Sequence, residues 1–341
     1  MMKIAIDKNS LSALDNENEF IYLFKDEKLK DLLKLNIRCM YYDRCDFADI
    51  NLTDYDIDCI KKAKIIDKDW KSLPEKVDYK IGIIIPNYNY AHTIDKCLSS
   101  IVNQTYKNYE VIFIDDMSTD NSVDIAYKYV DKLTNLKIVQ LKQKRYNGGA
   151  RNEGYLYLSN DVDYIYYIDS DDWLYDNNAL NNINNKLQKK PDVLFVGMAK
   201  FRNDEIKTCF IPQYKDKYEA IQGWSGSCGK VIKKRLATRQ ECLYNEGTLK
   251  EDKNQHCKIC IYMNDFELLK RPVYVWNQQN SKSVTTIREE VNWGTSTIRH
   301  YADTLQLYLS VKGKDKKIDE FLEERINKTE NEVKIGGDKQ W

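Results

Sequence analysis

Apolar runs and amphipathic stretches alternate along the chain between residues 79 and 197. Residues 81–86, IGIIIP, form a continuous apolar run, which is typical of a strand buried on both faces of a sheet. The next stretch, AHTIDKCLSSIVNQ, repeats apolar residues at helical spacing. Further strands are predicted at residues 108–116, 136–141, 164–169 and 192–197, each preceded by a helical pattern. This alternation predicts an α/β fold with a mostly parallel sheet and helices on both of its faces.

The helix after the second predicted strand has two possible start signals. Ser118 or Thr119 is expected to cap its N-terminus, and its apolar side runs from Val123 to Val130. Residues 148–159, GGARNEGYLYLS, and residues 178–190, NALNNINNKLQKK, are predicted to form the next two helices.

The segments on either side of this region have other patterns. Residues 1–78 are predicted to form a small α/β module of unknown role, with short strands and an amphipathic helix at 28–35. A linker carrying Pro74 joins it to the next domain. Residues 291–341 are amphipathic and charged, and we expect a helical C-terminal tail. This tail is expected to pack on the main domain, to form a homo-oligomer or to touch a partner.

Charge and cysteine content narrow the class of protein. The 341 residues contain 53 basic and 53 acidic side chains, so no net field draws the chain to nucleic acid or to anionic lipid. The nine cysteines show no disulfide-like regularity, and no export signal is recognised at the start of the sequence. No stretch approaches the roughly 18 uncharged apolar residues of a membrane span. A reduced, cytoplasmic protein is expected.

One group of metal-binding residue types stands apart from the other cysteines. Cys242, His256, Cys257 and Cys260 include a CxxC pair, which is a common half of a zinc site. The remaining two residues do not form a second clean pair. Zinc binding and ordinary burial of these side chains are therefore both left open.

Polar clusters follow three of the predicted strands. NYNY, DDMSTD and DSDD begin at residues 87, 115 and 169, and the carboxyl ends of parallel strands form the ligand-binding edge of such sheets. Asp169, Asp171 and Asp172 crowd like charges together, which raises carboxylate pKa values. Bound Mg²⁺ or Mn²⁺ would remove that repulsion, since hard cations take oxygen ligands. The alternative is that these acids only favour the start of a helix.

Five motifs in order carry a resemblance to a known family. They are PNYN at 86–89, IDDMSTDNS at 114–122, GGARNEG at 148–154, DSDDWL at 169–174 and KED at 250–252. Together they resemble the family 2 glycosyltransferases over residues 79–290. The resemblance implies a GT-A fold and an inverting enzyme that uses a nucleotide-diphosphate sugar. It also implies a nucleotide-sugar-binding half at 79–197 and an acceptor half at 198–290.

The resemblance also implies roles for residues on the donor side. Asp171 is the expected ligand of Mn²⁺ or Mg²⁺, with Asp169 supporting the metal or the ribose. Tyr88 is expected to stack on uracil and Asp116 to accept a hydrogen bond from it, while Asp115 fixes the following turn. Further donor contacts are expected from Pro86, Asn87, Asn89, Arg151 and Ser170.

Two of these donor-side motifs have a competing interpretation. DDMSTD can serve only as a helix-capping turn. Arg151 is implied to reach the base or the diphosphate, with Gly148 and Gly149 letting the backbone approach the ligand, but KRYNGG replaces the segment usual in the family. An ion pair at the start of its helix is the alternative role of Arg151.

The acceptor side requires a base that removes the proton of the attacking hydroxyl. The family's motif implies Asp252 for this role, and Glu251, about 100° away on a helix, is expected to face elsewhere. Trp224, Lys230 and Glu251 are the expected acceptor-side residues. In residues 276–285, WNQQNSKSVT, Lys282 and Ser283 are expected to meet the diphosphate.

The resulting hypothesis is transfer of a single sugar from a UDP-sugar to a hydroxyl of a glycan or lipid-linked sugar. The QxxRW signature of processive synthases is missing from the sequence, which favours one sugar per encounter. A protein or a hydroxylated DNA base is the alternative acceptor. From other classes, a non-catalytic nucleotide-sugar-binding scaffold and, more weakly, a nucleotidyltransferase are the rivals.

Overall fold

The computed structural model describes residues 77–133, 135–248, 251–280 and 293–337, with the backbone of four short strands before residue 77. The chain divides into two compact units, Met1–Val77 and Asp78–Trp341. In the first unit, β1 (Lys3–Ala5) pairs in parallel with β3 (Phe20–Tyr22), and β2 (Ser10–Ser12) pairs antiparallel with β4 (Ile65–Asp67). The helix predicted at 28–35 and most of the predicted linker lie outside the described residues.

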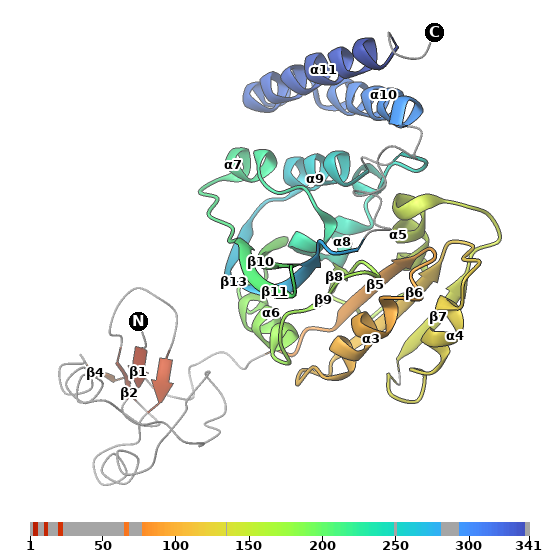
Figure 1. The fold of residues 1–341 in the computed structure, drawn as a ribbon. Coiled ribbons are helices and arrows are strands. Elements are labelled where there is room, and N and C mark those ends of the chain that lie inside the picture. Colours follow the sequence, from red (N-terminus) through yellow and green to blue (C-terminus); the bar gives the residue numbers. More distant parts are fainter. Residues whose placement is uncertain are drawn as a thin grey trace, which may run out of the picture. The chain divides into compact units, whose positions relative to one another are not determined.

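The second unit is built around a nine-stranded sheet (Figure 1). One half consists of parallel neighbours in the order β7-β6-β5-β8. In the other half, β12 runs antiparallel between β8 and β10, while β10 and β13 are parallel. Two shorter strands pair antiparallel at the margin, β9 with β13 and β11 with β10. The strands are β5 (Ile81–Asn87), β6 (Tyr109–Asp115), β7 (Leu136–Gln140), β8 (Tyr164–Tyr167), β9 (Trp173–Leu174), β10 (Val193–Arg202), β11 (Glu205–Phe210), β12 (Lys230–Lys233) and β13 (Phe266–Asn277).

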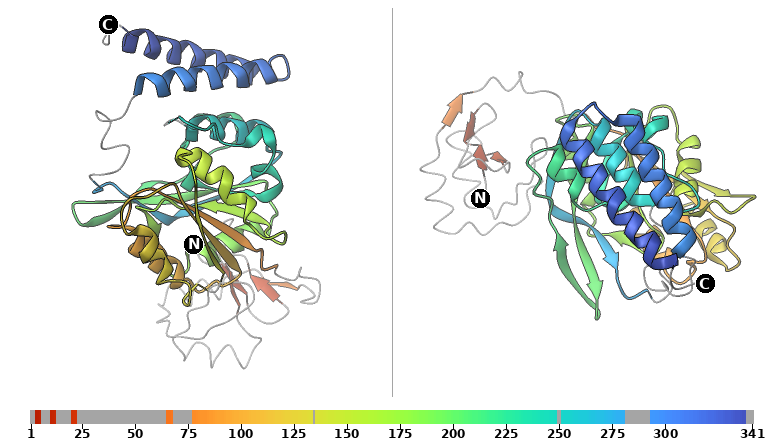
Figure 2. Two further views of the ribbon diagram at one scale, coloured as in Figure 1. Left: turned by 90° about the vertical axis from the view of Figure 1, so that its right-hand side faces the viewer. Right: turned by 90° about the horizontal axis from the view of Figure 1, so that it is seen from above.

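Helices cover both faces of this sheet, as the alternating pattern predicts (Figures 1 and 2). The apolar sides of α3, α4 and α6 share one core cluster with Ile81, Ile83 and Ile85 of β5. The other cluster contains Ile84, from the opposite face of the same strand, with α5, α7, α8 and α9. Every residue of β5 and β6 is buried, which explains their nearly continuous apolar sequence.

The helices and 3₁₀ turns of the second unit begin and end as follows. They are α3 (Ile94–Val102), α4 (Ser122–Tyr127), α5 (Tyr146–Leu156), α6 (Ala179–Leu187), α7 (Lys217–Gln222), η2 (Ser227–Gly229), α8 (Lys234–Ala237), η3 (Gln240–Cys242), α9 (Glu251–Tyr262), α10 (Trp293–Val311) and α11 (Lys316–Gly337).

The predicted start of α4 is wrong. The helix begins at Ser122, after neither Ser118 nor Thr119, and it ends before Val130. The hydroxyl of Ser118 is engaged by the preceding loops, where it accepts from the backbone N–H of Asn89. At the start of the helix, Asp120 instead accepts a hydrogen bond from the backbone N–H of Ser122 at 3.0 Å.

The C-terminal helices α10 and α11 pack against each other on the α9 side of the sheet (Figure 2). Leu307 and Tyr308 of α10 and Leu322 of α11 join the core cluster of that face. The hydroxyl of Thr304 donates to the side-chain oxygen of Asn254 on α9 at 3.1 Å. The predicted helical tail is therefore confirmed. In the described parts of the chain, none of the helices combines the length and the apolar character needed to span a bilayer.

Candidate functional site

The polar clusters predicted at the strand ends meet at one edge of the sheet. The hydroxyl of Ser170, after β8, donates to the carbonyl oxygen of Pro86 at 2.7 Å. The amide of Asn87, at the end of β5, donates to Asp115 Oδ1 at the end of β6 at 2.9 Å. Both hydrogen bonds are buried, and they connect the ends of β5, β6 and β8. The polar groups of Ser170 and Asn87 are therefore used within the protein and do not face a ligand.

The turn between β6 and α4 is fixed by hydrogen bonds across these loops. Asp115 accepts from the backbone N–H of Ser118 at 3.0 Å, so it holds the turn as predicted. Asn89 has a positive φ of 59°, and its side-chain oxygen accepts from the backbone N–H of Thr119 at 2.7 Å. The side-chain amides of Asn87 and Asn89, for which donor contacts are predicted, therefore form hydrogen bonds within these loops, because buried polar groups need partners within the protein.

An aromatic ring and a buried carboxylate lie together at this edge. Tyr88 is 42% exposed, and Lys144 Nζ lies 2.6 Å from the centroid of its ring. Asp116 accepts backbone hydrogen bonds from Arg145 at 2.7 Å and Tyr146 at 2.8 Å, and Lys144 Nζ is 3.3 Å from its Oδ2. Burial lowers the pKa of Lys144, and Asp116 opposes that change. Asp116 thus stabilises the start of α5 and also pairs with Lys144, whose ammonium lies over the Tyr88 ring.

The acidic turn after β8 holds three carboxylates in different surroundings. The side chain of Asp169 is 33% exposed, whereas those of Asp171 and Asp172 are buried. Burial and then the charge of Asp169 raise the pKa of Asp171 to about 6. Asp172 accepts from the Tyr274 hydroxyl at 2.6 Å and from the backbone N–H of Asn277 at 2.7 Å. Asp172 therefore ties the turn to β13.

A side-chain amide orients the second carboxylate of the turn. Asn280 Nδ2 donates to Asp171 Oδ2 at 2.8 Å, and Asn280 Oδ1 lies 3.0 Å from His92 Nε2. Asp171 is thus connected through Asn280 to the loop before α3. Residues 281–292, which include the predicted phosphate contacts Lys282 and Ser283, lie outside the described residues.

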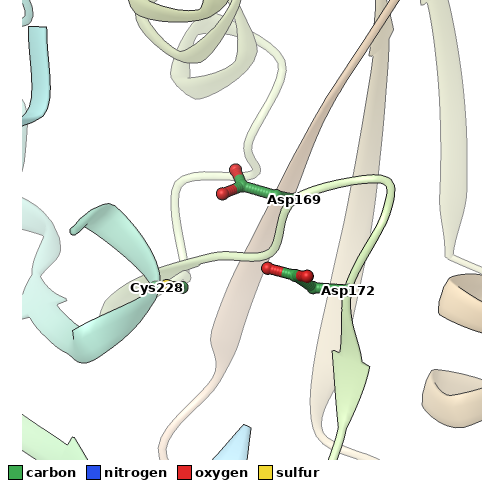
Figure 3. A group of neighbouring side chains, drawn as sticks. All are labelled: Asp169, Asp172 and Cys228. Atoms are coloured by element: carbon green, nitrogen blue, oxygen red, sulfur yellow. The ribbon is translucent and has the colours of Figure 1, made fainter. Parts of the chain in front are cut away.

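Side-chain chemistry decides which of these groups suit a divalent cation. Ligand atoms of Asp169, Asp172 and Cys228 lie within 4.8 Å of one another (Figure 3). Burial and then Asp169 raise the pKa of the Cys228 thiol, and both oxygens of Asp172 accept hydrogen bonds. Hard cations take oxygen ligands, so this trio does not fit Mg²⁺ or Mn²⁺. Asp169 and Asp171 supply carboxylate oxygens, and the charge of Asp169 adds to the effect of burial in raising the pKa of Asp171.

A buried arginine connects the acidic turn to α9. Arg151 is 1% exposed, and its guanidinium contacts Asp169 at 2.7 Å, Glu251 at 2.9 Å and Asp252 at 3.4 Å. Burial alone would lower its pKa, but these carboxylates raise it above the ordinary value. Arg151 thus forms ion pairs, as the competing interpretation predicts, and its contact with the donor stays a prediction. Its partners, however, lie in the acidic turn and on α9 rather than at the start of its own helix.

Glu251 and Asp252 begin α9, and both of them contact this guanidinium. The expectation that Glu251 faces elsewhere is wrong, because Arg151 lies against the first turn of α9, where two adjacent side chains reach it. Burial, then the charge of Asp252, raises the pKa of Glu251 to about 7, with Arg151 opposing the change. Asp252 is 34% exposed and accepts a hydrogen bond from the Ser227 hydroxyl.

Two predicted acceptor-side residues turn out to support the loop before β12. Lys230 is fully buried, and its ammonium donates to the carbonyl oxygens of Ser225 at 3.0 Å and Gly226 at 2.8 Å. Burial lowers its pKa. Trp224 packs edge-on against Trp276 with ring centroids 5.4 Å apart. The buried Lys230 is therefore held by this loop, and Trp224 lies in an aromatic cluster beside it.

The cysteine and histidine group does not form a metal site within the residues that the structure describes. His256 Nε2 lies 2.9 Å from the carbonyl oxygen of Ala220, and the Cys260 sulfur lies 3.8 Å from the same nitrogen. Cys242 instead contacts the carbonyl oxygen of Lys258. Burial lowers the pKa of His256 to about 3. These side chains are buried core residues, three of them on α9 itself and Cys242 on η3.

Sequence reasoning missed several residues of this site. Lys144 lies within KRYNGG, the segment whose departure from the family pattern was the one available signal. Ser227, Tyr244, Tyr274 and Asn280 make contacts that depend on segments far apart in the chain, and no local pattern marks them.

Comparisons with known proteins identify the family of the chain. Residues 82–262, more than half of the chain, match the model of glycosyl transferase family 2. The crystal structure of Staphylococcus aureus TarS 1-349 in complex with UDP-GlcNAc superposes with a TM-score of 0.58 and 21% identity, covering 66% of each chain. This likeness supports the fold alone, and the predicted GT-A architecture is confirmed.

Relatives of known sequence match shorter stretches. The Escherichia coli UDP-Glc:alpha-D-GlcNAc-diphosphoundecaprenol beta-1,3-glucosyltransferase WfgD is 30% identical over 144 residues, which are 42% of this chain and 55% of that protein. Glycosyltransferase GlyA of Streptococcus pneumoniae is 40% identical over 101 residues, 29% of this chain and 14% of that protein. The matched stretch thus spans between about a seventh and about half of these relatives. On the match of the family model, the chain belongs to glycosyl transferase family 2.

Proposed function

We propose that the chain is an inverting glycosyltransferase that moves a single sugar from a UDP-sugar to an acceptor hydroxyl. The observation that carries the proposal is the position of Arg151. Its guanidinium contacts Asp169 on the acidic turn at 2.7 Å and Asp252 on α9 at 3.4 Å. The reaction requires a group that stabilises the leaving diphosphate and a base. The residues proposed for these two roles both contact the buried guanidinium of Arg151.

Asp252 is the proposed base. It takes the proton of the acceptor hydroxyl, whose oxygen forms a bond to the anomeric carbon of the sugar. The bond between that carbon and the phosphate oxygen breaks, and its electron pair leaves with UDP. Attack from the face opposite the diphosphate inverts the anomeric configuration. The partial exposure of Asp252 is consistent with access for an acceptor.

Asp171 and Asp169 are the proposed ligands of Mn²⁺ or Mg²⁺. When bound, the ion would supply positive charge to the leaving diphosphate. Asn280 keeps Asp171 Oδ2 in place through the 2.8 Å hydrogen bond. Arg151 holds Asp169 Oδ1, so the acidic turn keeps its shape when no ion is present.

The nucleobase is proposed to lie on Tyr88. An exposed ring provides a broad apolar face, and Asp116 and Lys144 supply an acceptor and a donor beside it. TarS was crystallised with UDP-GlcNAc, and the name of WfgD includes UDP-Glc. These relatives favour UDP as the nucleotide.

The proposed acceptor is a hydroxyl of a glycan or of a lipid-linked sugar. The WfgD name specifies a sugar on diphosphoundecaprenol, and poly(ribitol-phosphate) is in the name of a relative from Staphylococcus aureus that is 33% identical over 126 residues. The balanced net charge disfavours DNA, because phosphate contacts need clustered basic residues.

A donor screen tests the proposal. UDP release is measured with UDP- and GDP-sugars in the presence of Mn²⁺, for the unaltered chain and for Asp252→Asn. We expect turnover with a UDP-sugar, a fall of about 100-fold or more in the variant, and UDP affinity within about threefold. Turnover by Asp252→Asn at a near-normal rate would refute the base. UDP binding without turnover on any donor would instead favour a non-catalytic scaffold.

A further inference from the structure

Two buried hydroxyl groups lead by hydrogen bonds to the same oxygen of Asp252 that Arg151 contacts. The hydroxyl of Tyr244 donates to Ser227 Oγ at 2.7 Å, and Ser227 Oγ donates to Asp252 Oδ1. Tyr244 and Ser227 are both buried. The proposed transfer reaction assigns no role to either hydroxyl.

The carboxylate of Asp252 determines the direction of the hydrogen bonds in the series from Tyr244 through Ser227. A carboxylate accepts hydrogen bonds, so Ser227 must donate to Asp252 and is left to accept from Tyr244. The contact with Arg151 also goes to Oδ1 of Asp252. Two donors on one oxygen fix the rotation of the carboxylate and direct proton acceptance to Oδ2.

The position of Tyr244 is itself fixed from α5. Asn152, next to Arg151, accepts from the backbone N–H of Tyr244 at 3.0 Å and donates to its carbonyl oxygen at 2.9 Å. The ring of Tyr244 lies 5.2 Å from the Arg151 guanidinium. Two adjacent residues of α5 therefore reach the same carboxylate, one directly and one through Tyr244 and Ser227.

A glycine permits this close approach between α5 and the segment that carries Tyr244. A Cβ atom at Gly148 would lie 2.7 Å from the carbonyl oxygen of Asn245 and 3.2 Å from the Tyr244 Cβ. The first distance is shorter than real Cβ contacts, so the segment would have to move. Gly148, expected to let the backbone approach a ligand, instead lets it approach residues 244–245.

We propose that Ser227 and Tyr244 are positioning residues that hold the Asp252 carboxylate with Oδ2 toward the acceptor hydroxyl. The proposal rests on the proposed role of Asp252 as the base. Neither residue touches the reacting atoms. Their hydrogen bonds stabilise the charged carboxylate and restrict its orientation, and a small misplacement of a catalytic group costs a large part of its effect.

Other charged and titratable groups also surround Asp252, and the variants below leave them in place. They are Arg151 on α5, Glu251 on α9, Lys230 on β12 and Cys228 on η2.

The test compares Ser227→Ala and Tyr244→Phe with the unaltered chain. UDP release from UDP-glucose and from UDP-N-acetylglucosamine, with Mn²⁺ and with water as the acceptor, gives kcat and KM. We expect kcat to fall between about 10- and 100-fold for Ser227→Ala and less for Tyr244→Phe. KM for the donor and the affinity for UDP stay within about twofold. A fall in kcat at an unchanged KM is the result expected when the carboxylate loses its orientation and the donor site stays intact.

Tyr164→Phe is the matched control. Its buried hydroxyl donates to the carbonyl oxygen of Pro191 at 3.0 Å, so the change removes a comparable hydrogen bond at the start of β8, whereas the acidic turn follows the end of that strand. We expect this variant to lose stability while the kcat of the folded protein stays unchanged. If Ser227→Ala does not fold, Tyr244→Phe decides alone, because it keeps the ring and removes only the hydroxyl.

Asp252→Asn separates the two proposals. If Asp252→Asn is inactive while both other variants keep the kcat of the unaltered chain, the positioning role is wrong and the base assignment survives. If Asp252→Asn remains active, the base assignment fails and the positioning role fails with it.

Discussion

Residues 79–197, the proposed donor half, and residues 198–290, the proposed acceptor half, hold key carboxylates in different ways. In the donor half, Asp116 accepts hydrogen bonds from the backbone N–H groups of Arg145 and Tyr146. In the acceptor half, Asp252 is held by side chains, Arg151 and Ser227. Backbone contacts persist when a neighbouring side chain changes, whereas side-chain contacts are lost with it. The donor half should therefore tolerate substitution better than the acceptor half.

Removing the arginine that joins the halves should have the largest effect. Arg151→Gln leaves the buried Glu251 and its two acidic neighbours without their cation. We expect the free energy of unfolding to fall by about 3–5 kcal/mol and kcat to fall by about 100-fold or more. Denaturant unfolding and UDP release measure these two changes.

Arg145→Gln is the control for this variant. Arg145 precedes the same helix and pairs with Glu153 and Glu246, but its side chain is 26% exposed. We expect a loss of about 1 kcal/mol or less. Equal losses in the two variants would contradict the idea that the halves depend on one buried cation.

Acid should weaken the acceptor half through His256 on α9. Burial lowers the pKa of His256 to about 3 from the ordinary 6.5, so the folded state keeps it neutral while the unfolded chain takes up a proton below pH 6.5. Its contribution to stability is full above pH 6.5 and is lost as the pH falls toward 3. Between pH 7 and pH 5 we expect a loss of about 2 kcal/mol from this group.

The comparison with His256→Gln isolates that contribution. The variant keeps every other titratable group, so the difference in unfolding free energy between the two chains, measured by denaturant titration at each pH, belongs to His256. We expect the unaltered chain to show the steeper fall with acid. Parallel pH dependences would show that His256 is not buried in its neutral form.

A change in the donor half should have the smallest effect. Tyr88→Ala removes the proposed stacking surface for the base, and we expect the Kd of UDP to rise by about tenfold with little change in stability, because the ring is 42% exposed. Tyr127→Ala, on the exposed side of α4, is the control and should leave the Kd unchanged. Calorimetry with Mn²⁺ measures both, and equal affinities would exclude Tyr88 from the base site.

The difference between buried strands and side-chain contacts across the fold explains how far the sequence predicts the structure. Strands such as β5 and β6 are buried along their whole length, so their apolar runs identify them and place the polar clusters at one edge. The partners of Arg151 are not predictable in this way, because Glu251 lies 100 residues further along the chain. Helical angles within α9 do not predict the position of Glu251, because the long side chain of Arg151 packs against the first turn of that helix.

The central claim is that Asp171 and Asp169 bind the cation that engages the leaving diphosphate. The most direct measurement is a crystal grown with Mn²⁺ and UDP and examined by the anomalous scattering of manganese. We predict a manganese peak at about 2.0–2.6 Å from a carboxylate oxygen of Asp171, the range of hard cations with oxygen ligands, with Asp169 beside it and phosphate oxygens completing the shell. A peak at Asp172 and Cys228, or bound UDP with no metal at the acidic turn, would contradict the claim.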